Sequence, residues 1–549
     1  MSLPCLVHED DDLLVINKPA GFNTHAPAPH AGQGLYEWLR DHEPRWASLA
    51  IIHRLDKDTS GLILFSKSDL ANRSLTGQFT GRSVRKTYLF ATDRSVAWRD
   101  RVVESHLARQ GARRVSDTQR SDAKAARTRF RRLPDPEWLP GLVKKLPHDA
   151  LHGPLTAWEA RPMTGRTHQI RAQAAEQGLP IFGDSLYRGS RAPRLHLHAA
   201  ALELRHPRTG QPVRFEAACP FRETAWTALR KALIDPEETD AFRWVHGASD
   251  GWRGWYVDQL NHCLLSQAES ELNGPQRRLL EDLVRAPGAR DGSAVYHKRL
   301  LRKVRESSAQ EASPRHELGT EMKDPFLVRE NGLQFEIRLE EGYSTGLFLD
   351  QRENRRRLLN GHVCPGFSLP RADGGRAALL NTFSYTCAFS VCAARHGYVT
   401  TSLDLSRKYL DWGRRNFVHN QLDPGEHDFI FGNAMEWMRR LARKGRRFDV
   451  VLLDPPTFSK SKTGGLFRAE KDYALLVSLA AELLVPDGVL FASCNAARLE
   501  PAAFLAMVRQ GVEQTRRRIR QSHYVPQPPD FPVTRAEPAY LKTFWARIG

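Results

Sequence analysis

At 549 residues the chain is too long for one hydrophobic core, and its length favours two to four domains. It has 81 Lys and Arg against 63 Asp and Glu, a net charge of +18 that indicates a polyanionic partner, with nucleic acid favoured over a membrane surface. The absence of a long apolar run, of a basic secretory leader and of CxxC spacing among the seven cysteines predicts a cytoplasmic protein with no membrane span, disulfide scaffold or metal site.

From about residue 5 to 218 the sequence consists of short β-like runs separated by turns and basic loops. Runs such as LLVINK (13–18), GLILFSK (61–67) and RKTYLFAT (85–92) are rich in aliphatic and aromatic residues and end at Gly, Pro or charged positions. This pattern of short apolar runs and turns predicts an α+β domain with a mixed, largely antiparallel sheet over residues 1–220.

A segment rich in charge and proline follows this block. The residues ACPFRETAWTALRKALIDPEETDAF (218–242) predict a linker over 221–241. After it, residues 242–345 indicate a small, mostly β domain, which we expect to bind substrate RNA.

Strands and helices alternate from about residue 377 onward. The runs AALLNTF (377–383), YVTTSLDL (398–405) and FDVVLLD (448–454) each precede a stretch with helical periodicity. This alternation of strands and helices predicts an α/β Rossmann-like domain over 346–549. Its sheet would be doubly wound and parallel, with ligands bound at the carboxyl ends of the strands.

The stretch HRLDKDTSG (53–61) brings Arg54 and Asp56 close together on a Thr-Ser-Gly turn. Taken alone, such a pair favours an ordinary ion pair that orders a hairpin. Four more motifs stand around it in a fixed order: LLVINKPAG (13–21), RKTY (85–88), GRTHQIR (165–171) and IFGDSLY (181–187). With them, residues 5–218 resemble the RluA-type family of pseudouridine synthases.

This resemblance implies that the first block converts a uridine of RNA to pseudouridine, a rearrangement that needs no cofactor. Asp56 corresponds to the catalytic carboxylate, and Arg166 of GRTHQIR to the guanidinium that keeps it ionised. Tyr88 would lie against the detached uracil, although alone it is equally well explained as a strand tyrosine. Arg54 would fill the space left by the flipped nucleotide.

A second set of ordered motifs covers residues 242–549. They are YSTGLFLDQRENRR (343–356), NTFSYTCAFSVCAARHG (381–397), SLDLSRKYLDWGRRN (402–416), FDVVLLDPPTFSKSK (448–462) and EPAYLKTF (537–544). This region resembles the RlmI/RlmK-type methyltransferases of 23S ribosomal RNA, class I enzymes that use S-adenosylmethionine.

The resemblance implies a role for each motif at the cofactor and the base. Residues Asn381, Phe383 and Ser384 would lie against the methionine end of the cofactor, Asp404 would bind the ribose hydroxyls and Asn433 the adenine. The flipped base would be held by the turn after the fourth strand, which consists of Asp454, also expected at the cofactor, and of Pro455, Pro456 and Phe458.

Two alternatives stay open for this half. Cys387 and Ala388 replace glycines that are common in relatives, and glycine lets backbone approach a cofactor closely, so an inactive cofactor site is one alternative. Asp404 has a second interpretation as an acid that satisfies backbone amides at the start of a helix.

The identity of the methylated base rests on Cys494. Methylation of cytosine C5 needs a thiolate that adds to the ring, and Cys494 follows a strand where it could serve. Guanine N7 already has a lone pair, so its methylation needs only positioning. The segments SRKYLDW and DPPTFSKSK are more similar to the guanine-N7 branch of the resembled methyltransferases. We therefore expect methylation at guanine N7, with cytosine C5 as the alternative.

Together these observations predict a bifunctional RNA-modifying enzyme, a pseudouridine synthase joined to an S-adenosylmethionine-dependent rRNA methyltransferase. The expected partner is 23S rRNA or a ribosome precursor. Two alternatives remain: a ribosome-assembly factor that holds RNA with an inactive methyltransferase half, and tRNA as the substrate of the pseudouridine half. The sequence does not determine an oligomeric state.

Overall fold

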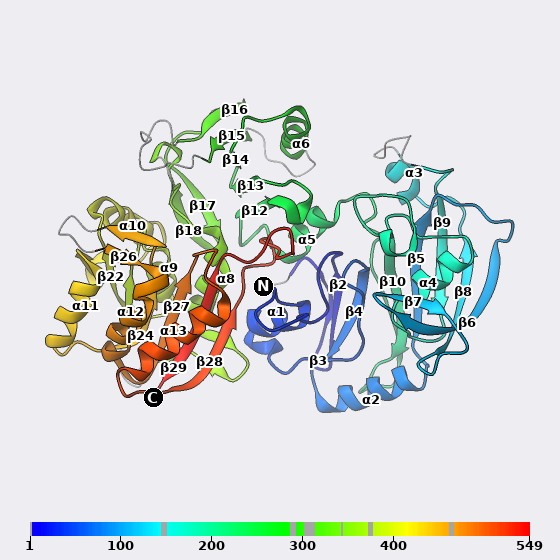
Figure 1. The fold of residues 1–549 in the computed structure, drawn as a ribbon, viewed down its shortest axis with the longest axis horizontal. Helices are drawn as coiled ribbons and strands as arrows, with labels where there is room; N and C mark the ends of the chain where they lie inside the picture. Colours follow the sequence, from blue (N-terminus) through cyan, green and yellow to red (C-terminus); the bar gives the residue numbers. More distant parts are fainter. Residues whose placement is uncertain are drawn as a thin grey trace. The chain divides into compact units, whose positions relative to one another are not determined.

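The computed structural model describes residues 3–143, 151–285, 293–300, 313–341, 344–371, 377–460 and 466–549. The chain forms two compact units: unit 1 contains residues 1–27, 33–38 and 48–235, and unit 2 contains residues 28–32, 39–47 and 236–549. In Figure 1, most of unit 1 is coloured blue to teal and most of unit 2 green to red. None of the helices among the described residues has the length and apolar character needed to cross a membrane.

Unit 1 is built on an eleven-stranded sheet in the order β1-β2-β4-β10-β5-β9-β8-β6-β7, with β11 beside β10 and β3 beside β4. All its pairings are antiparallel except the parallel pairing of β10 with β4. The predicted mixed, largely antiparallel α+β fold is confirmed. The strands are β1 (Leu6–Glu9), β2 (Leu13–Lys18), β3 (Ala50–Ile51), β4 (Ser60–Ser66), β5 (Arg85–Thr92), β6 (Asp100–Gln110), β7 (Arg113–Ser116), β8 (Lys124–Arg132), β9 (Thr156–Pro162), β10 (Leu197–Arg205) and β11 (Pro212–Glu216).

Helices cover this sheet and position its loops. Leu13, Leu62 and Leu64 on β2 and β4 pack against Ala71 and Leu75 of α2, and both strands are buried along almost their whole length. A helix, α5, also occupies much of the segment predicted as a linker. The helices of this unit are α2 (Asp69–Thr80), α3 (Trp138–Val143), α4 (Gln169–Glu176) and α5 (Ala225–Leu233), while α1 (Leu35–His42) has its first half in unit 1 and its second half in unit 2.

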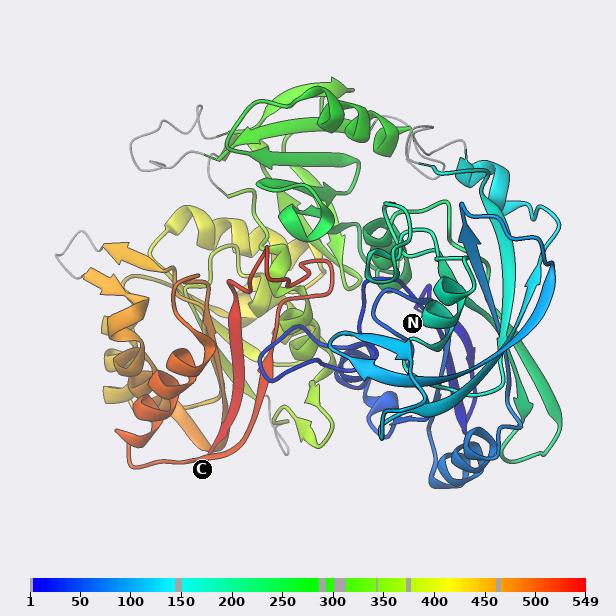
Figure 2. The ribbon, with the colours of Figure 1, turned by 45° about the vertical axis from the view of Figure 1, so that its right-hand side comes forward.

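Unit 2 contains a five-stranded sheet followed by a hairpin. The sheet has the order β12-β13-β14-β15-β16, and the hairpin pairs β17 with β18. Figures 1 and 2 show this sheet and helix α6 in green. The predicted small β domain covers the same part of the chain, and its residues 286–292, 301–312 and 342–343 lie outside the described ones. The elements are β12 (Ala241–His246), β13 (Trp255–Leu260), β14 (Cys263–Ala268), α6 (Gly274–Val284), β15 (Ala294–Arg299), β16 (Arg315–Gly319), β17 (Phe326–Glu330) and β18 (Leu333–Ile337).

The second sheet of unit 2 has seven strands in the order β23-β22-β21-β24-β27-β29-β28. The pairings among the first five strands are parallel, whereas β29 pairs antiparallel with both β27 and β28. The chain leaves β21 towards β22 and later returns to β24 on its other side, so β21 marks the point where ligands bind in such sheets. The strands are β21 (Ala378–Thr382), β22 (Val399–Asp404), β23 (Asp428–Phe431), β24 (Phe448–Leu453), β27 (Leu484–Cys494), β28 (Ile519–Val525) and β29 (Lys542–Ile548).

Helices and short hairpins complete this α/β domain, which confirms the predicted Rossmann-like fold. The elements are α8 (Arg352–Asn360), β19 (His362–Cys364), β20 (Phe367–Ser368), α9 (Ala388–Arg395), α10 (Arg407–His419), α11 (Ala434–Arg443), β25 (Phe458–Lys460), β26 (Leu466–Arg468), α12 (Ala469–Leu483) and α13 (Pro501–Glu513).

Helix α8 is unusual because it buries a series of charged side chains. Every residue from Arg352 to Leu358 is buried. Arg352 binds Asp530 at 2.6 Å and Arg355 binds Glu330 at 2.6 Å. Segment 39–47 of unit 2 supplies the remaining partners: Asp41 lies 3.2 Å from Arg357, His42 lies 3.4 Å from Glu353, and Glu43 binds Arg356. Pairing each charge offsets much of the cost of burial.

Candidate functional site

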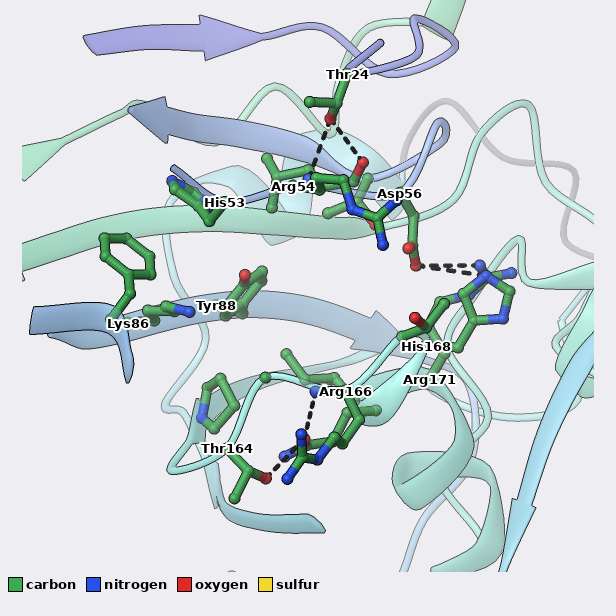
Figure 3. A pocket seen from close by; sticks show the side chains of 18 of the residues that line it. Thr24, His53, Arg54, Asp56, Lys86, Tyr88, Thr164, Arg166, His168 and Arg171 are labelled. Atoms are coloured by element: carbon green, nitrogen blue, oxygen red, sulfur yellow. Dashed lines mark hydrogen bonds and ion pairs between the residues drawn. The ribbon is translucent and has the colours of Figure 1, made fainter. Parts of the chain in front are cut away.

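Unit 1 contains a cavity of about 810 Å³ lined by residues from three of the predicted motifs. HRLDKDTSG contributes Arg54 and Asp56, RKTY contributes Lys86 and Tyr88, and GRTHQIR contributes its whole length. Figure 3 shows these side chains converging from separate elements.

Buried hydrogen bonds fix the turn that carries Asp56. Thr24 Oγ1 donates to the carbonyl of Leu55 at 2.9 Å and accepts from its amide at 3.2 Å. The ammonium of the fully buried Lys18 donates to the carbonyls of Pro19, Phe22 and Lys57 at 2.9, 2.7 and 3.0 Å. Burial lowers the pKa of Lys18 to about 7. The lysine of LLVINKPAG thus holds the backbone behind the carboxylate.

The Asp56 carboxylate faces two cationic or titratable groups. Its Oδ2 lies 3.4 Å from Nη1 of Arg171 and 3.7 Å from Nε2 of His168, and its side chain is 26% exposed. Arg171 also donates to both oxygens of Asp184 at 2.7 and 2.8 Å, and Asp184 is fully buried. Asp184 therefore fixes the guanidinium, which places a positive charge beside the Asp56 carboxylate.

The expected pairing of Arg166 with Asp56 is corrected by this geometry. Arg166 lines the cavity, but its Nε donates to the carbonyl of Ala125 at 3.2 Å. It lies in the loop before α4, which begins at Gln169, whereas Arg171 lies on the helix and reaches Asp56. The motif GRTHQIR contains both arginines, and its pattern alone does not indicate which one turns inward. A role for Arg166 towards substrate remains a prediction.

Tyr88 and Lys86 project from β5 into the same cavity, two residues apart and so on one face of the strand. Burial, with a further contribution from the Asp56 charge, raises the pKa of Tyr88, so its phenol remains a hydrogen-bond donor at neutral pH. Lys86 was not predicted, although the alternation of RKTY points to it. Burial lowers its pKa, and its ammonium lies 4.7 Å from the Phe79 ring. Arg54 is exposed at this cavity.

The second predicted site lies at the carboxyl ends of β21 and β22. Asp404 ends β22, and its carboxylate accepts from the amides of Tyr385 and Ser406, each at 2.9 Å. Burial raises its pKa. The alternative interpretation of Asp404 as an acid that satisfies amides matches these contacts, and its role towards ribose remains a prediction.

The loop after β21 adopts a constrained backbone. Phe383, Tyr385 and Cys387 have φ values of 58°, 49° and 62°, in the left-handed region that side chains seldom adopt. Such strain is concentrated at ligand sites. Cys387 is fully buried, and a Cβ at Gly413 would lie only 2.3 Å from its sulfur. The thiol therefore fills the space left by a glycine on α10.

The groups around this loop fit S-adenosylmethionine. Asn381 Nδ2 donates to Ser390 at 2.9 Å, while its buried Oδ1 has no hydrogen-bond partner among the described residues and suits a ligand donor. Ser384 is also buried beside it. At the ends of the next strands, Leu405 and Phe431 are 43% and 48% exposed and offer apolar surface for a base.

Asn433 begins the helix after β23. Its Oδ1 accepts from the amide of Glu436 at 3.1 Å, so the side chain caps α11. A carbonyl oxygen has a second lone pair, which leaves room for the predicted contact with adenine.

The predicted base-holding turn follows β24. Asp454 accepts from Gln351 Nε2 at 3.1 Å, and burial raises its pKa to about 6. Pro455 is buried, Pro456 is exposed, and Phe458 begins β25. Residues 461–462 of this motif lie outside the described ones.

Cys494 lies at the same edge of the sheet. It ends β27, the parallel neighbour of β24. Its side chain is 1% exposed, and burial raises the pKa of its thiol.

A cluster of Asp10, Asp12 and His206 has the composition of a metal site, with ligand atoms within 4.8 Å of one another. Its oxygens are already engaged by neighbouring side chains, however. Asp10 Oδ2 lies 2.7 Å from His8 and 3.1 Å from His206, and Asp12 binds Arg208 at 2.6 Å. The cluster is an ion-pair network between β1, β2 and the turn after β10.

Comparison with known proteins identifies both halves. Residues 12–176 match the family model of RNA pseudouridylate synthase, and residues 251–546 match that of S-adenosylmethionine-dependent methyltransferase. A ribosomal RNA large subunit methyltransferase of Deinococcus radiodurans is 33% identical over 357 residues, which is 63% of this chain and 83% of the relative.

Two further relatives each match one half. Ribosomal RNA large subunit methyltransferase K of Neisseria meningitidis is 34% identical over 218 residues, 39% of this chain and 57% of the relative. Ribosomal large subunit pseudouridine synthase C of Yersinia pestis is 36% identical over 229 residues, 39% of this chain and 65% of the relative.

Proposed function

We propose that this chain, which belongs to the S-adenosylmethionine-dependent methyltransferase family and carries an RNA pseudouridylate synthase domain ahead of it, modifies ribosomal RNA twice. Unit 1 isomerises a uridine to pseudouridine, and unit 2 methylates a base of 23S rRNA or a ribosome precursor in the cytoplasm. The observation that carries the proposal is the Asp56 carboxylate, held by Arg171 in a cavity of about 810 Å³. The net charge of +18 supports a polyanionic substrate.

Isomerisation breaks the bond from uracil N1 to the sugar C1′ and forms a bond from C5 to C1′. The C5 proton is lost and N1 gains one, so no atom is added and we propose that unit 1 needs no cofactor. Asp56, which lies 3.4 Å from Arg171, acts at the sugar. The protonated phenol of Tyr88 lies in the same cavity, where it contacts the rotating uracil. Arg54 occupies the place of the flipped nucleotide.

For methylation, S-adenosylmethionine supplies the methyl group when it is bound. Among the residues around it, Asn381, Phe383 and Ser384 hold its methionine end, Asp404 its ribose and Asn433 its adenine. The turn of Asp454, Pro455, Pro456 and Phe458 contacts one side of the acceptor base at the strand ends. The acceptor atom we favour is guanine N7, because its own lone pair makes correct positioning sufficient.

The burial of Cys494 supports guanine over cytosine. A thiol that adds to a cytosine ring must be accessible and form a thiolate readily. Cys494 is 1% exposed and its pKa is raised, the opposite of an activated nucleophile.

The absence of this chain from cells is expected to remove one pseudouridine and one N7-methylguanine from 23S rRNA. Mass-spectrometric mapping of rRNA and tRNA from a deletion strain and its complemented parent measures both losses. A pseudouridine missing from tRNA instead assigns unit 1 to tRNA. If both modifications persist while ribosome assembly is impaired, the chain is an RNA-holding assembly factor and the proposal fails.

Cys494→Ala is expected to retain methyl transfer within about threefold of the parent, because the thiol only fills space at a strand end. The loss of packing should cost about 1 kcal/mol of unfolding free energy. Transfer of labelled methyl to rRNA from the deletion strain measures the effect, and calorimetric titration of S-adenosylmethionine verifies that the variant binds cofactor. A folded, cofactor-binding variant that transfers no methyl group would establish the cytosine C5 alternative.

A further inference from the structure

A second cavity, of about 180 Å³, lies entirely within unit 2. It is smaller than the 300–1,000 Å³ typical of pockets for drug-sized ligands, and its size suits a single planar fragment. Its walls come from the strands of the β12–β16 sheet, from segment 344–350 and from the C-terminal segment that contains Phe531 and Tyr540.

Segment 344–350 connects this cavity to both parts of the methyl-transfer site. The ring of Phe348 lies 5.2 Å from that of Tyr385, in the loop that follows β21. Gly346 O accepts from Thr386 Oγ1 of the same loop at 2.6 Å. Gln351, immediately after the segment, donates to Asp454 at 3.1 Å. The cavity therefore lies beside the place expected for the methyl donor and beside the end of β24.

Two groups of opposite charge line the cavity from different elements. Asp350 accepts from the Tyr540 hydroxyl at 2.9 Å, and its second carboxylate oxygen can accept further bonds. Lys298, on β15, is 4% exposed, and burial lowers its pKa to about 8. The cavity is also lined by the ion pair of Arg243 and Asp258, which is bidentate at 2.7 and 3.1 Å and electrically balanced.

An exposed aromatic ring marks the rim of the cavity. The Phe348 side chain is 48% exposed, although it lies in an otherwise buried stretch between Leu347 and Leu349. An exposed flat ring beside a small polar cavity is the arrangement on which RNA bases stack.

We propose that this cavity is the pocket for the base to be methylated, with Phe348 as the stacking surface and Asp350 and Lys298 as the groups that read its edge. The inference rests on the proposed methylation of an RNA base. Guanine fits best, because its Watson–Crick edge has two adjacent N–H donors for the carboxylate and an oxygen for the ammonium. Cytosine offers the carboxylate one amino group and is the weaker match. When the base is read at this edge, N7 on the opposite edge is free to face the donor.

Phe348→Ala and Asp350→Asn are each expected to lower kcat/KM for methyl transfer to rRNA from the deletion strain by 10- to 100-fold in the full-length chain. The affinity for S-adenosylmethionine, measured by calorimetry, should stay within twofold. Phe348→Trp, which keeps a stacking surface, should restore most of the activity. Asp411→Asn is the matched control, because Asp411 is an exposed residue of α10 outside the cavity.

If the parent transfers methyl and both variants keep full activity, the pocket is disproved while the proposed function stands. If the parent transfers no methyl to any RNA, the proposed methylation fails. In that case saturation-transfer NMR with guanosine monophosphate tests the pocket, because this measurement needs no turnover. Contact that Phe348→Ala removes supports the pocket, and no contact with the parent protein overturns it.

Discussion

Asp56→Asn is expected to abolish pseudouridine formation, with a loss of at least about 10²- to 10⁴-fold, and to leave methyl transfer unchanged. The substitution keeps the size and one oxygen of the side chain but removes the charge that acts at the sugar. Methyl transfer should persist because the residues proposed for it lie in unit 2, which has its own cores. Both products can be measured on the same rRNA from the deletion strain by mass spectrometry.

Asp58→Asn provides the matched control for this experiment. Asp58 is exposed and lies two positions further along the same turn, so the two variants remove the same charge from neighbouring sites. The control should isomerise uridine at the parental rate. If Asp56→Asn retains turnover, Asp56 is not the reacting carboxylate. If both variants lose turnover equally, the charge of the whole turn is required and the assignment to Asp56 alone fails.

Arg171→Met is expected to stop pseudouridine formation, whereas Arg166→Met should leave a measurable rate. Arg171 is the guanidinium beside Asp56, and Arg166 binds the carbonyl of Ala125 instead. The single Arg171 variant also leaves Asp184 buried without its partner, which costs about 3–5 kcal/mol of unfolding free energy. Loss of activity could then reflect unfolding.

The double variant Arg171→Met with Asp184→Asn separates these two causes. The side-chain amide that replaces the Asp184 carboxylate carries no charge. Its oxygen can still accept from the backbone amide of Tyr187, as Asp184 does at 3.2 Å. We expect melting close to that of the parent and no pseudouridine. A folded double variant with parental turnover would show that Asp56 does not depend on this guanidinium.

The sequence predicted the fold and the general location of the first site because motif order carries that information. It assigned the guanidinium to Arg166 because both arginines of GRTHQIR satisfy the same pattern. Which arginine reaches Asp56 depends on His168. This residue immediately precedes α4, and its φ of 55° sets the direction of the helix. Backbone geometry of this kind is decided by tertiary packing.

The second site shows the same limit. The segment 343–356 was recognised as a motif, but its residues Phe348 and Asp350 had no assigned role, because their meaning depends on a cavity formed with β15 and Tyr540. The assignment of residues 39–47 to unit 2 had no sequence signal either. Contacts between residues hundreds of positions apart leave no local pattern.

The buried charges of α8 determine how this protein can be divided. Arg356, Arg357 and Glu353 find their partners in segment 39–47, which is far away in the sequence but belongs to the same compact unit. A gene split after residue 235 would produce a C-terminal polypeptide that lacks segment 39–47, and with it the carboxylate partners of Arg356 and Arg357. A separation of the two enzymes at that boundary would therefore leave part of the methyltransferase unit on the pseudouridine synthase polypeptide.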